Sequence, residues 1–522
     1  MPKQIHELIT LSADKSPDKT ALYFKKNTQN YGEFTQEVEK IASGLLSLGI
    51  TKGERIGIYL PKRLETVSSF FACSYAGAVF VPINPLLKPE QVSYILKDCN
   101  VRILISSHDR LKQLSEVLDS CHDLLCAVDV NNKAETGMFS RIHMSHWKDL
   151  LDSETQGSHN RIDTDVASIL YTSGSTGQPK GVVLSHRNMI TGAKSVAEYL
   201  NNTPNDNLLA VLPFSFDYGL SQLTTAFHVG ASTTLMDYLL PRDVIRAIPK
   251  FGITGLAGVP PLWNQLAQLD WGEANNTLRY MTNSGGAMPI PTLNKLREAV
   301  PASKFYLMYG LTEAFRSTYL PPEEIDNRPD SMGKAIPNAE VMVVREDGSP
   351  CAPGEPGELV HRGSLVALGY WNAPDKTAER FKPAPIQEDG LTIPEIAVWS
   401  GDQVKMDEEG YLYFVSRKDE MIKTSGYRVS PTEVEEIVYG TGLVSEAAAL
   451  GLPHPTLGQA ITLVATSEKD IDSEILLNEC KKALPNFMVP AHIELIDVMP
   501  KNPNGKIDRK ALNEEYKNIF DN

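Results

Sequence analysis

The chain has 522 residues, of which 42% are hydrophobic and 22% charged, and its formal net charge is −15. This length exceeds what one compact core holds, so we expect about two to four domains or subdomains. The composition excludes disordered and collagen-like proteins, and the negative charge argues against a nucleic-acid or anionic-membrane surface, which would need a basic face. We therefore expect small molecules or proteins as partners.

Six cysteines are spread along the chain without a Cys-x-x-Cys pair, which favours a reduced, cytoplasmic protein. Cys121, His122 and Cys126 lie close in sequence, but no second ligand cluster accompanies them, so we expect ordinary thiols. The N-terminal segment lacks the apolar core of a signal peptide. No uninterrupted apolar stretch reaches the roughly eighteen residues of a membrane span, so none is expected.

From Arg55 to Gly310, short apolar runs alternate with helix-like stretches. This alternation predicts an α/β fold with largely parallel sheets. The apolar runs are 55–60, 101–106, 208–213, 232–235 and 304–308.

A glycine- and hydroxyl-rich loop, Tyr171-Thr-Ser-Gly-Ser-Thr-Gly-Gln-Pro-Lys180-Gly181, follows the apolar run 166–170. Its backbone N–H groups, its hydroxyls and its lysine suit a phosphate group. A Walker A loop ends in Gly-Lys-Ser/Thr and leads into a helix, whereas Lys180 here lies between Pro179 and Gly181. The loop therefore predicts nucleotide binding outside the P-loop class.

Two further motifs follow apolar runs: Asn283-Ser-Gly-Gly-Ala-Met-Pro289 and Tyr309-Gly-Leu-Thr-Glu313. Ligands of open α/β sheets bind at the carboxyl ends of strands. The second motif could there stack a base, contact a phosphate and hold Mg²⁺. Taken alone, an ordinary strand end explains it equally well, and a structural turn explains the first motif better.

The sequence pattern changes after about residue 333. Extended runs separated by glycines continue to about residue 414 and predict a small β-rich subdomain. A third unit begins after Ser416. Ser430 at an N-cap, Pro431 at the first helical position and Glu433 at the capping-box position predict a helix over 431–438. The remaining pattern predicts a compact α+β domain of about a hundred residues.

Charged residues near the junction and the C-terminus are ambiguous by composition. Asp402 and Arg417 offer an acid and a base, but a solvated turn and a surface charge explain them too. The lysine-containing loop 500–510 is, by itself, typical of a solvated face.

Together, the order, spacing and residue sequences of these motifs resemble those of the adenylate-forming superfamily, which includes acyl-CoA synthetases, luciferases and nonribosomal peptide adenylation domains. The resemblance extends over nearly the whole chain. The resemblance implies an N-terminal adenylation domain over 1–416, with mostly parallel α/β sheets and a β-barrel-like subdomain over about 333–414. It further implies a hinge over 417–420 at Asp419 and a small mobile α+β C-terminal domain over 421–522.

The resemblance also assigns site residues. Catalytic roles fall to Lys506, which would bridge the carboxylate and the α-phosphate, and to Lys423, Thr312 and Glu313, with Glu313 holding Mg²⁺. Tyr309 would stack on adenine, and Asp402 and Arg417 would bind the ribose. The positions that match nucleotide- or CoA-binding residues are Thr172, Ser173, Gly174, Ser175, Thr176, Gly177, Lys180, Gly285, Gly286, Ala287, Tyr309, Gly310, Asp402, Arg417 and Gly426.

The implied function is that of an acid–thiol ligase, which uses ATP to form an acyl-adenylate and pyrophosphate and then a thioester, with CoA as the expected thiol. Lysine and Mg²⁺ would stabilise the charge that develops when a carboxylate attacks a phosphate. The carboxylate needs no general base, because it is already ionised at neutral pH. Two alternatives stay open: loading of an amino acid onto a carrier-protein phosphopantetheine, and an adenylate-binding or luciferase-like protein that forms no thioester.

The segment Pro213-Phe-Ser-Phe-Asp-Tyr-Gly-Leu220 matches the motif that lines the acyl pocket. Its Phe-Asp dipeptide is similar to the corresponding residues of amino-acid adenylation domains, in which the aspartate pairs with the substrate's amino group. Asp217 could equally turn away and cap the following turn. The pocket positions implied by the resemblance are Phe216, Asp217, Gly258, Gly285 and Met308.

Arg316 could bind a second carboxylate, although solvation of its loop is the favoured interpretation. The runs 212–231 and 314–322 are similar to the exosortase A-associated AMP-forming ligases, a bacterial subgroup. That similarity implies a bacterial cytosolic enzyme linked to a surface-export system and leaves the acid undefined.

Overall fold

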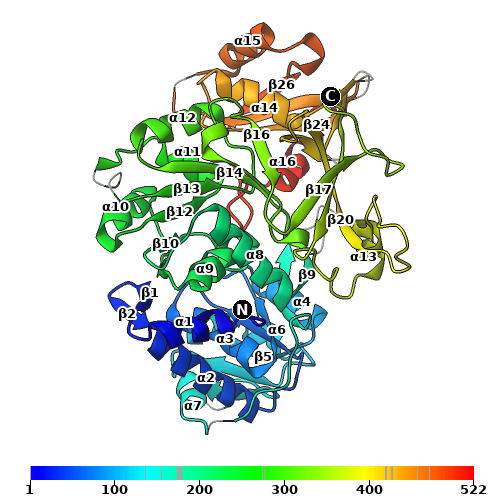
Figure 1. Cartoon of the computed structure of the whole chain (residues 1–522). Coiled ribbons are helices and arrows are strands. Elements are labelled where there is room, and N and C mark those ends of the chain that lie inside the picture. The colour runs from blue at the N-terminus through cyan, green and yellow to red at the C-terminus, as the bar shows by residue number, and fades with distance from the viewer. Residues whose placement is uncertain are drawn as a thin grey trace.

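The computed structural model describes residues 2–135, 137–154, 156–172, 179–272, 274, 277–417, 420–424, 427–454, 457–469 and 471–521. The chain runs from an N-terminal α/β lobe, blue to cyan at the bottom of Figure 1, through a central sheet to a C-terminal domain at the top. Within the described residues, no helix is both long and apolar enough to cross a bilayer.

The sheet of the N-terminal lobe is parallel except for its last pair, β8 and β9, which is antiparallel. Its strands, in spatial order, are β7 (His143–His146), β6 (Cys126–Asp129), β5 (Val101–Ser106), β3 (Arg55–Tyr59), β4 (Val79–Pro82), β8 (Val166–Thr172) and β9 (Lys180–Ser185). The accompanying helices are α2 (Tyr31–Ser47), α3 (Leu64–Ala76), α4 (Pro89–Asp98), α5 (His108–Gln113), α6 (Ser115–Leu118) and α7 (Trp147–Leu151).

The central sheet begins with an antiparallel hairpin, continues through parallel strands and ends in antiparallel ones. Its first strands in spatial order are β2 (Asn27–Asn30), β1 (Thr20–Phe24), β11 (Ser232–Leu235), β10 (Asn207–Ala210), β12 (Gly255–Gly258), β13 (Tyr280–Asn283) and β14 (Lys304–Tyr309). Every residue of β10, β11, β12 and β13 is buried, as expected for parallel strands covered on both faces.

The sheet continues into the glycine-punctuated region, through β15 (Thr318–Leu320), β16 (Ser331–Ala335), β21 (Leu412–Arg417), β20 (Ile396–Met406), β18 (Gly357–Gly363) and β17 (Ala339–Val344), with β19 (Phe381–Pro383) beside β20. The expected β-rich texture is confirmed, but the expectation of a barrel-like unit is wrong. Strand β16 pairs with both β15 and β21, so these strands extend the central sheet and do not close on themselves.

The helices of the central region are α1 (Glu7–Lys15), α8 (His186–Tyr199), α9 (Asp217–Val229), α10 (Pro241–Phe251), α11 (Pro260–Leu266), α12 (Ile290–Ala299) and α13 (Pro374–Arg380). The five apolar runs of the sequence all contain strands. The run 208–213 is the exception in extent, because β10 already ends at Ala210. Pro213 cannot donate to a ladder, and residues 211–213 line a cavity instead.

The C-terminal domain is α+β and has its own core. It comprises β22 (Ile422–Thr424), β23 (Tyr427–Val429), α14 (Pro431–Gly440), β24 (Glu446–His454), β25 (Gly458–Thr466), α15 (Ser473–Ala483), β26 (His492–Leu495) and α16 (Arg509–Tyr516). The predicted helix over 431–438 is confirmed as α14, whose N-cap Ser430 accepts a hydrogen bond from the Glu433 amide at 3.3 Å.

Candidate active site

The nucleotide half of the site is assembled from three strands, β14, β20 and β21. Tyr309 ends β14, and the strand register places Asp402 of β20 opposite Arg417 of β21. The Tyr309 hydroxyl donates a hydrogen bond to the Asp402 carboxylate, whose other oxygen lies 3.6 Å from Arg417 Nε. The predicted base-stacking tyrosine and the predicted ribose ligands therefore form one contiguous cluster.

Burial dominates the electrostatics of this cluster. It raises the pKa of Asp402, while the hydrogen bond from Tyr309 and the charge of Arg417 oppose that shift. Burial also raises the pKa of Tyr309 well above its ordinary value, and the neighbouring Asp402 charge adds to it. Tyr309 therefore stays a neutral donor, and Asp402 is held by a hydrogen bond and a cation.

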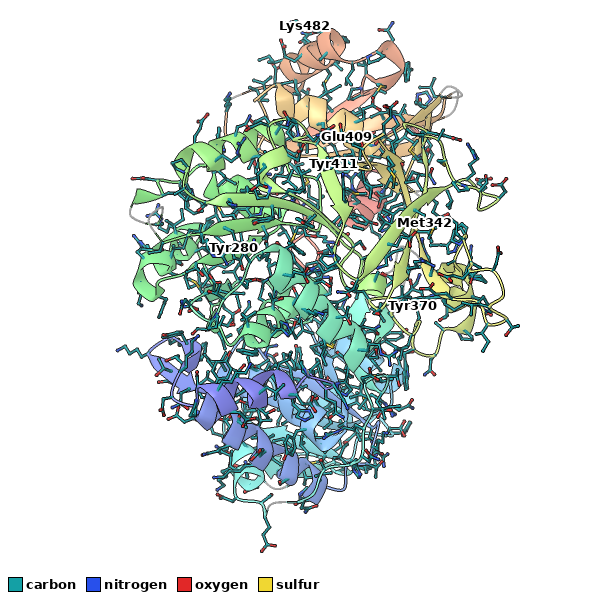
Figure 2. All side chains as sticks on the ribbon, viewed as in Figure 1. Tyr280, Met342, Tyr370, Glu409, Tyr411 and Lys482 are labelled. Carbon is teal, nitrogen blue, oxygen red and sulfur yellow. The ribbon has the colours of Figure 1, made fainter. Side chains whose placement is uncertain are left out.

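A carboxylate and a lysine both contact Tyr370, which is labelled in Figure 2 and forms a backbone bridge with Val182 of β9. The Tyr370 hydroxyl donates to Glu313 Oε1 at 2.5 Å, and Lys180 Nζ lies 5.3 Å from the centre of its ring. Burial, Lys376 and Arg380 lower the pKa of Lys180, whereas Glu313 opposes that shift. A phosphate group and a cation could both be held here.

Thr172 and Lys180 face each other as a cross-strand pair at the end of the β8–β9 hairpin. The glycine-rich loop therefore joins two antiparallel strands, which is a different arrangement from the strand-to-helix turn of a Walker A loop. Other predicted site residues lie outside what the structure describes: Ser173, Gly174, Ser175, Thr176, Gly177, Asp419, Gly426 and the side chain of Lys423.

Lys506 reaches the site on a tight loop from the C-terminal domain, drawn in red at the centre of Figure 1. Lys501 and Ile507 form an isolated bridge, Gly505 has φ +80°, and Asn502 Oδ1 accepts from the Lys506 amide at 3.1 Å. From the N-terminal lobe, Asn84 Nδ2 donates to the Pro503 carbonyl at 2.9 Å. Both the loop's own bonds and a contact across the domains thus fix where Lys506 lies.

The glycine loop 284–287 makes room for this lysine. Gly285 has φ +83°, and a Cβ there would lie 2.9 Å from Lys506 Cε. Asn283 Nδ2 donates to the Gly286 carbonyl at 3.1 Å and so shapes the loop, whose residues Gly286 and Ala287 are exposed. Lys506 Nζ also lies 5.0 Å from the Phe216 ring centre.

The acyl half departs from what the sequence suggested. Asp217 begins α9 and is 4% exposed, and its Oδ2 accepts from Arg316 Nη1 at 2.7 Å. Thr312 Oγ1 donates to its Oδ1 at 3.3 Å. The expectation that Arg316 solvates its loop is wrong, because this side chain is 2% exposed and ion-paired. Pairing with Arg316 is a third arrangement of Asp217, distinct from both interpretations of the sequence.

Two predicted pocket residues face other parts of the protein. Met308 is buried against α8, where its sulfur accepts a hydrogen bond from the Tyr199 hydroxyl at 3.0 Å. A Cβ on Gly258 would lie 2.6 Å from the ring of buried Trp263, so this glycine makes room for the indole. The alternation of side chains along β14 explains why Met308 points away from the site that Tyr309 faces, because neighbouring residues on a strand point to opposite faces of the sheet.

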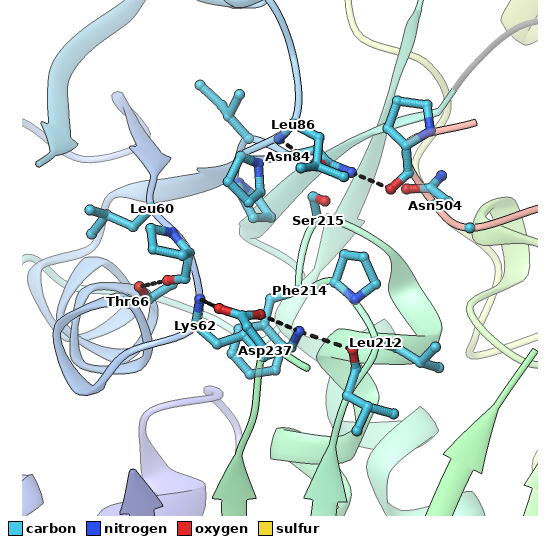
Figure 3. Close-up of a pocket in the computed structure, with 18 of the residues that line it drawn as sticks. Leu60, Lys62, Thr66, Asn84, Leu86, Leu212, Phe214, Ser215, Asp237 and Asn504 are labelled. Carbon is cyan, nitrogen blue, oxygen red and sulfur yellow. Dashed lines mark hydrogen bonds and ion pairs between the residues drawn. The ribbon is translucent and has the colours of Figure 1, made fainter. Parts of the chain in front are cut away.

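A cavity of about 600 Å³ ends beside the Lys506 loop (Figure 3). Its walls are mostly apolar and come from both domains: Leu60, Leu86 and Val259 belong to the N-terminal domain, and Asn502 to Gly505 belong to the C-terminal domain. At its edge, Lys62 Nζ bonds Asp237 Oδ1 at 2.9 Å and the Val211 carbonyl at 3.0 Å.

Sequence reasoning singled out the segment from Pro213 and the loop 500–510, which both line this cavity, but it missed the lining residues of the N-terminal lobe. Lys62 follows β3 and Asn84 follows β4, so both lie just past the carboxyl ends of parallel strands. That position is the usual place for ligand contacts in α/β sheets. The signal was present, but no motif marked it.

Comparison with known proteins agrees with this architecture. Residues 9–371 match the family model described as AMP-binding enzyme, and residues 433–506 match its C-terminal domain. A long-chain-fatty-acid–CoA ligase of Escherichia coli O157:H7 is 29% identical over 511 residues, which cover 91% of this chain and 88% of that protein.

Tyrocidine synthase 1 of Brevibacillus parabrevis is 28% identical over 98% of this chain, but the chain spans only 45% of that protein. Among solved structures, the anthranilate CoA ligase AuaEII in complex with anthranoyl-AMP superposes on this chain with a TM-score of 0.88 at 25% sequence identity. The superposition covers all of this chain and 99% of the AuaEII chain. With both family models matched in order along the sequence, this chain belongs to the AMP-binding enzymes.

Proposed function

We propose that the chain is an ATP-dependent acid–thiol ligase, which adenylates a carboxylic acid, releases pyrophosphate and passes the acyl group to CoA. One observation carries the proposal: Lys506 of the C-terminal domain contacts Gly285 and Phe216 of the N-terminal domain, and its charge interacts with that of Asp217. A cation there would stabilise the charge formed when a carboxylate attacks the α-phosphate.

ATP fits the residues around this lysine. Asp402 can accept hydrogen bonds from two ribose hydroxyls, and Tyr309 offers an aromatic face beside it. Lys180, at the end of the phosphate-loop hairpin, would bind the leaving phosphates. The buried oxygen of Asn283 has no hydrogen-bond partner among the described residues, so a donor of the ligand could satisfy it.

Mg²⁺ also fits. Glu313 supplies a hard carboxylate oxygen next to Lys180, and Mg²⁺ typically takes one or two carboxylates together with substrate phosphates and water. Among the described residues, no three His, Cys, Asp or Glu side chains gather into a cluster, so Glu313 is the proposed protein ligand. When bound, the ion would neutralise the pyrophosphate as it leaves.

CoA is proposed as the thiol because two of the similar proteins that span nearly the whole chain are CoA ligases by name. The apolar cavity that ends at the Lys506 loop offers space beside the reacting atoms for a second substrate. The similarity of residues 212–231 and 314–322 to exosortase A-associated ligases stays a prediction about biological context.

The test measures the two half-reactions separately. Exchange of labelled pyrophosphate into ATP should depend on an added carboxylic acid and on Mg²⁺, and an acyl-CoA of the matching mass should appear when CoA is supplied. A panel of aliphatic, aryl and amino acids covers the substrate range. Absence of exchange with every acid would refute the proposal, and exchange without acyl-CoA would refute its second half.

A further inference from the structure

Arg316 is one of the largest fully buried side chains among the described residues. Its Nη1 donates to Asp217 at 2.7 Å and its Nη2 to Ser221 Oγ at 2.6 Å, while its Cζ lies 4.7 Å from the Tyr218 ring centre. A buried charge is costly unless it is paired and hydrogen-bonded. These contacts pair the charge and satisfy both terminal nitrogens within the protein, without a substrate, and leave only Nε without a hydrogen-bond partner among the described residues.

The backbone holds Arg316 in this position by a strained residue. Phe315 has φ +55° and ψ −39°, a conformation that bulky residues rarely adopt. Its ring is fully buried against α8 at Gly192, where a Cβ would lie only 2.3 Å from Phe315 Cδ1. Such strain persists only where the surroundings enforce it, and it often marks functional sites.

The negative charge of Asp217 is therefore already matched. One carboxylate oxygen accepts from Arg316 and the other from Thr312, and Asp217 also interacts favourably with the charge of Lys506. An ammonium group placed here would join two cations and find no free anion. A second carboxylate would have to displace Asp217 from Arg316 and leave it buried without its partner.

We infer that Arg316 determines the substrate class: by holding Asp217 in a neutral pair, it restricts adenylation to acids whose reacting carboxylate is their only ionised group, and it rejects α-amino acids. The inference rests on the proposed function and sharpens it. Arg316 acts through Asp217, so it is a specificity-determining residue that need not touch the reacting atoms.

The experiment compares matched acids in pyrophosphate exchange: octanoate, 2-aminooctanoate and octanedioate, and likewise 3-phenylpropanoate with phenylalanine. For the natural protein, kcat/KM should favour the amino-free monoacid over its amino acid by at least about 100-fold, because the ammonium would be desolvated beside like charges. In Arg316→Met, Asp217 loses its partner, and the preference should shrink by at least about 10-fold through a gain for the amino acids.

Two further variants separate specificity from structure. Arg316→Lys keeps the cation and should keep most of the preference, and Arg316→Met with Asp217→Asn removes both charges and should restore it. A purely structural Arg316 would lower the rates for all acids together and leave the ratio unchanged, which would overturn the inference.

The natural protein decides the question even if the variants fail to fold. Preference for amino acids or for the diacid would overturn the inference while upholding adenylation. Exchange with none of the acids would overturn the proposed function itself, and the inference with it.

Discussion

The nucleotide half and the acyl half of the site are built by different devices. In the nucleotide half, strand register sets Asp402 opposite Arg417, and Tyr309 completes the cluster from the end of β14, which β15 and β16 separate from β21 in the sheet. In the acyl half, a strained turn at Phe315 brings Arg316 onto Asp217 at the start of a helix. Regular sheet geometry makes the first half readable from local motifs, whereas the second depends on one irregular turn.

Lys506 lies where the two halves meet, so its removal should have the largest effect. Lys506→Ala should slow pyrophosphate exchange by about 100- to 1,000-fold, the usual consequence of deleting a group that stabilises developing charge. Formation of the thioester from a supplied acyl-adenylate should be largely spared. Lys510→Ala, which removes an exposed charge four residues along, should change neither rate. Equal losses in both half-reactions would show that Lys506 serves the site as a whole.

The separation of the halves can be tested at Asp402. Asp402→Asn keeps an oxygen for the Tyr309 hydroxyl but removes the charge, so KM for ATP should rise about 10- to 100-fold, as expected for a charged hydrogen-bonding group. KM for the acid should stay unchanged. Asp389→Asn, at an exposed position, is the matched control. A parallel rise in KM for the acid would break the comparison.

Asn84 tests how far the C-terminal loop depends on the N-terminal lobe. Asn84→Ala removes the hydrogen bond to the Pro503 carbonyl, worth about 1 kcal/mol, and should slow adenylation about 5-fold. Thioester formation from the acyl-adenylate should not slow, because that step does not use this contact. Asn205→Ala on the exposed surface serves as the control. Slowing of thioester formation alone would contradict this assignment.

The smallest expected effect is a shift in the pKa of Lys506, which depends on charged residues of the acyl half. Burial lowers the pKa of Lys506, Asp217 opposes that shift, and Arg316 adds to it. Since the lysine must be cationic, the exchange rate should fall as pH rises through its lowered pKa, below the ordinary lysine value. Asp217→Asn should move this limb of the pH profile of kcat/KM to lower pH, and Arg316→Met to higher pH. Shifts in the same direction would show that the acyl-half charges do not act on Lys506.

Much of this organisation could be predicted from the sequence. The apolar runs contain the strands, and Ser430 with Pro431 marks the start of α14, because both signals are local. The continuity of the central sheet could not be predicted, since it depends on β16 pairing on both sides. Which distant strands pair with each other is not recorded in the local sequence pattern of either strand.

The acyl half shows the same limit at the level of side chains. Asp217 and Arg316 are 99 residues apart, and each alone is compatible with a solvated position. The available clue was physical: a carboxylate at a buried helix start needs a compensating cation. For Met308, the alternation of β14 would have indicated that it faces away from its neighbour Tyr309.

One wall of the cavity in Figure 3 comes from a different domain than the rest, because Asn502 to Gly505 belong to the C-terminal domain. Any molecule that uses this wall gains affinity only while the lysine loop is docked, and by thermodynamic reciprocity it favours docking by the same factor. A molecule that needs the space behind the wall must do the opposite and drive the loop away. The occupancy of one cavity and the position of a whole domain are thus a single equilibrium, which a ligand can shift from either end.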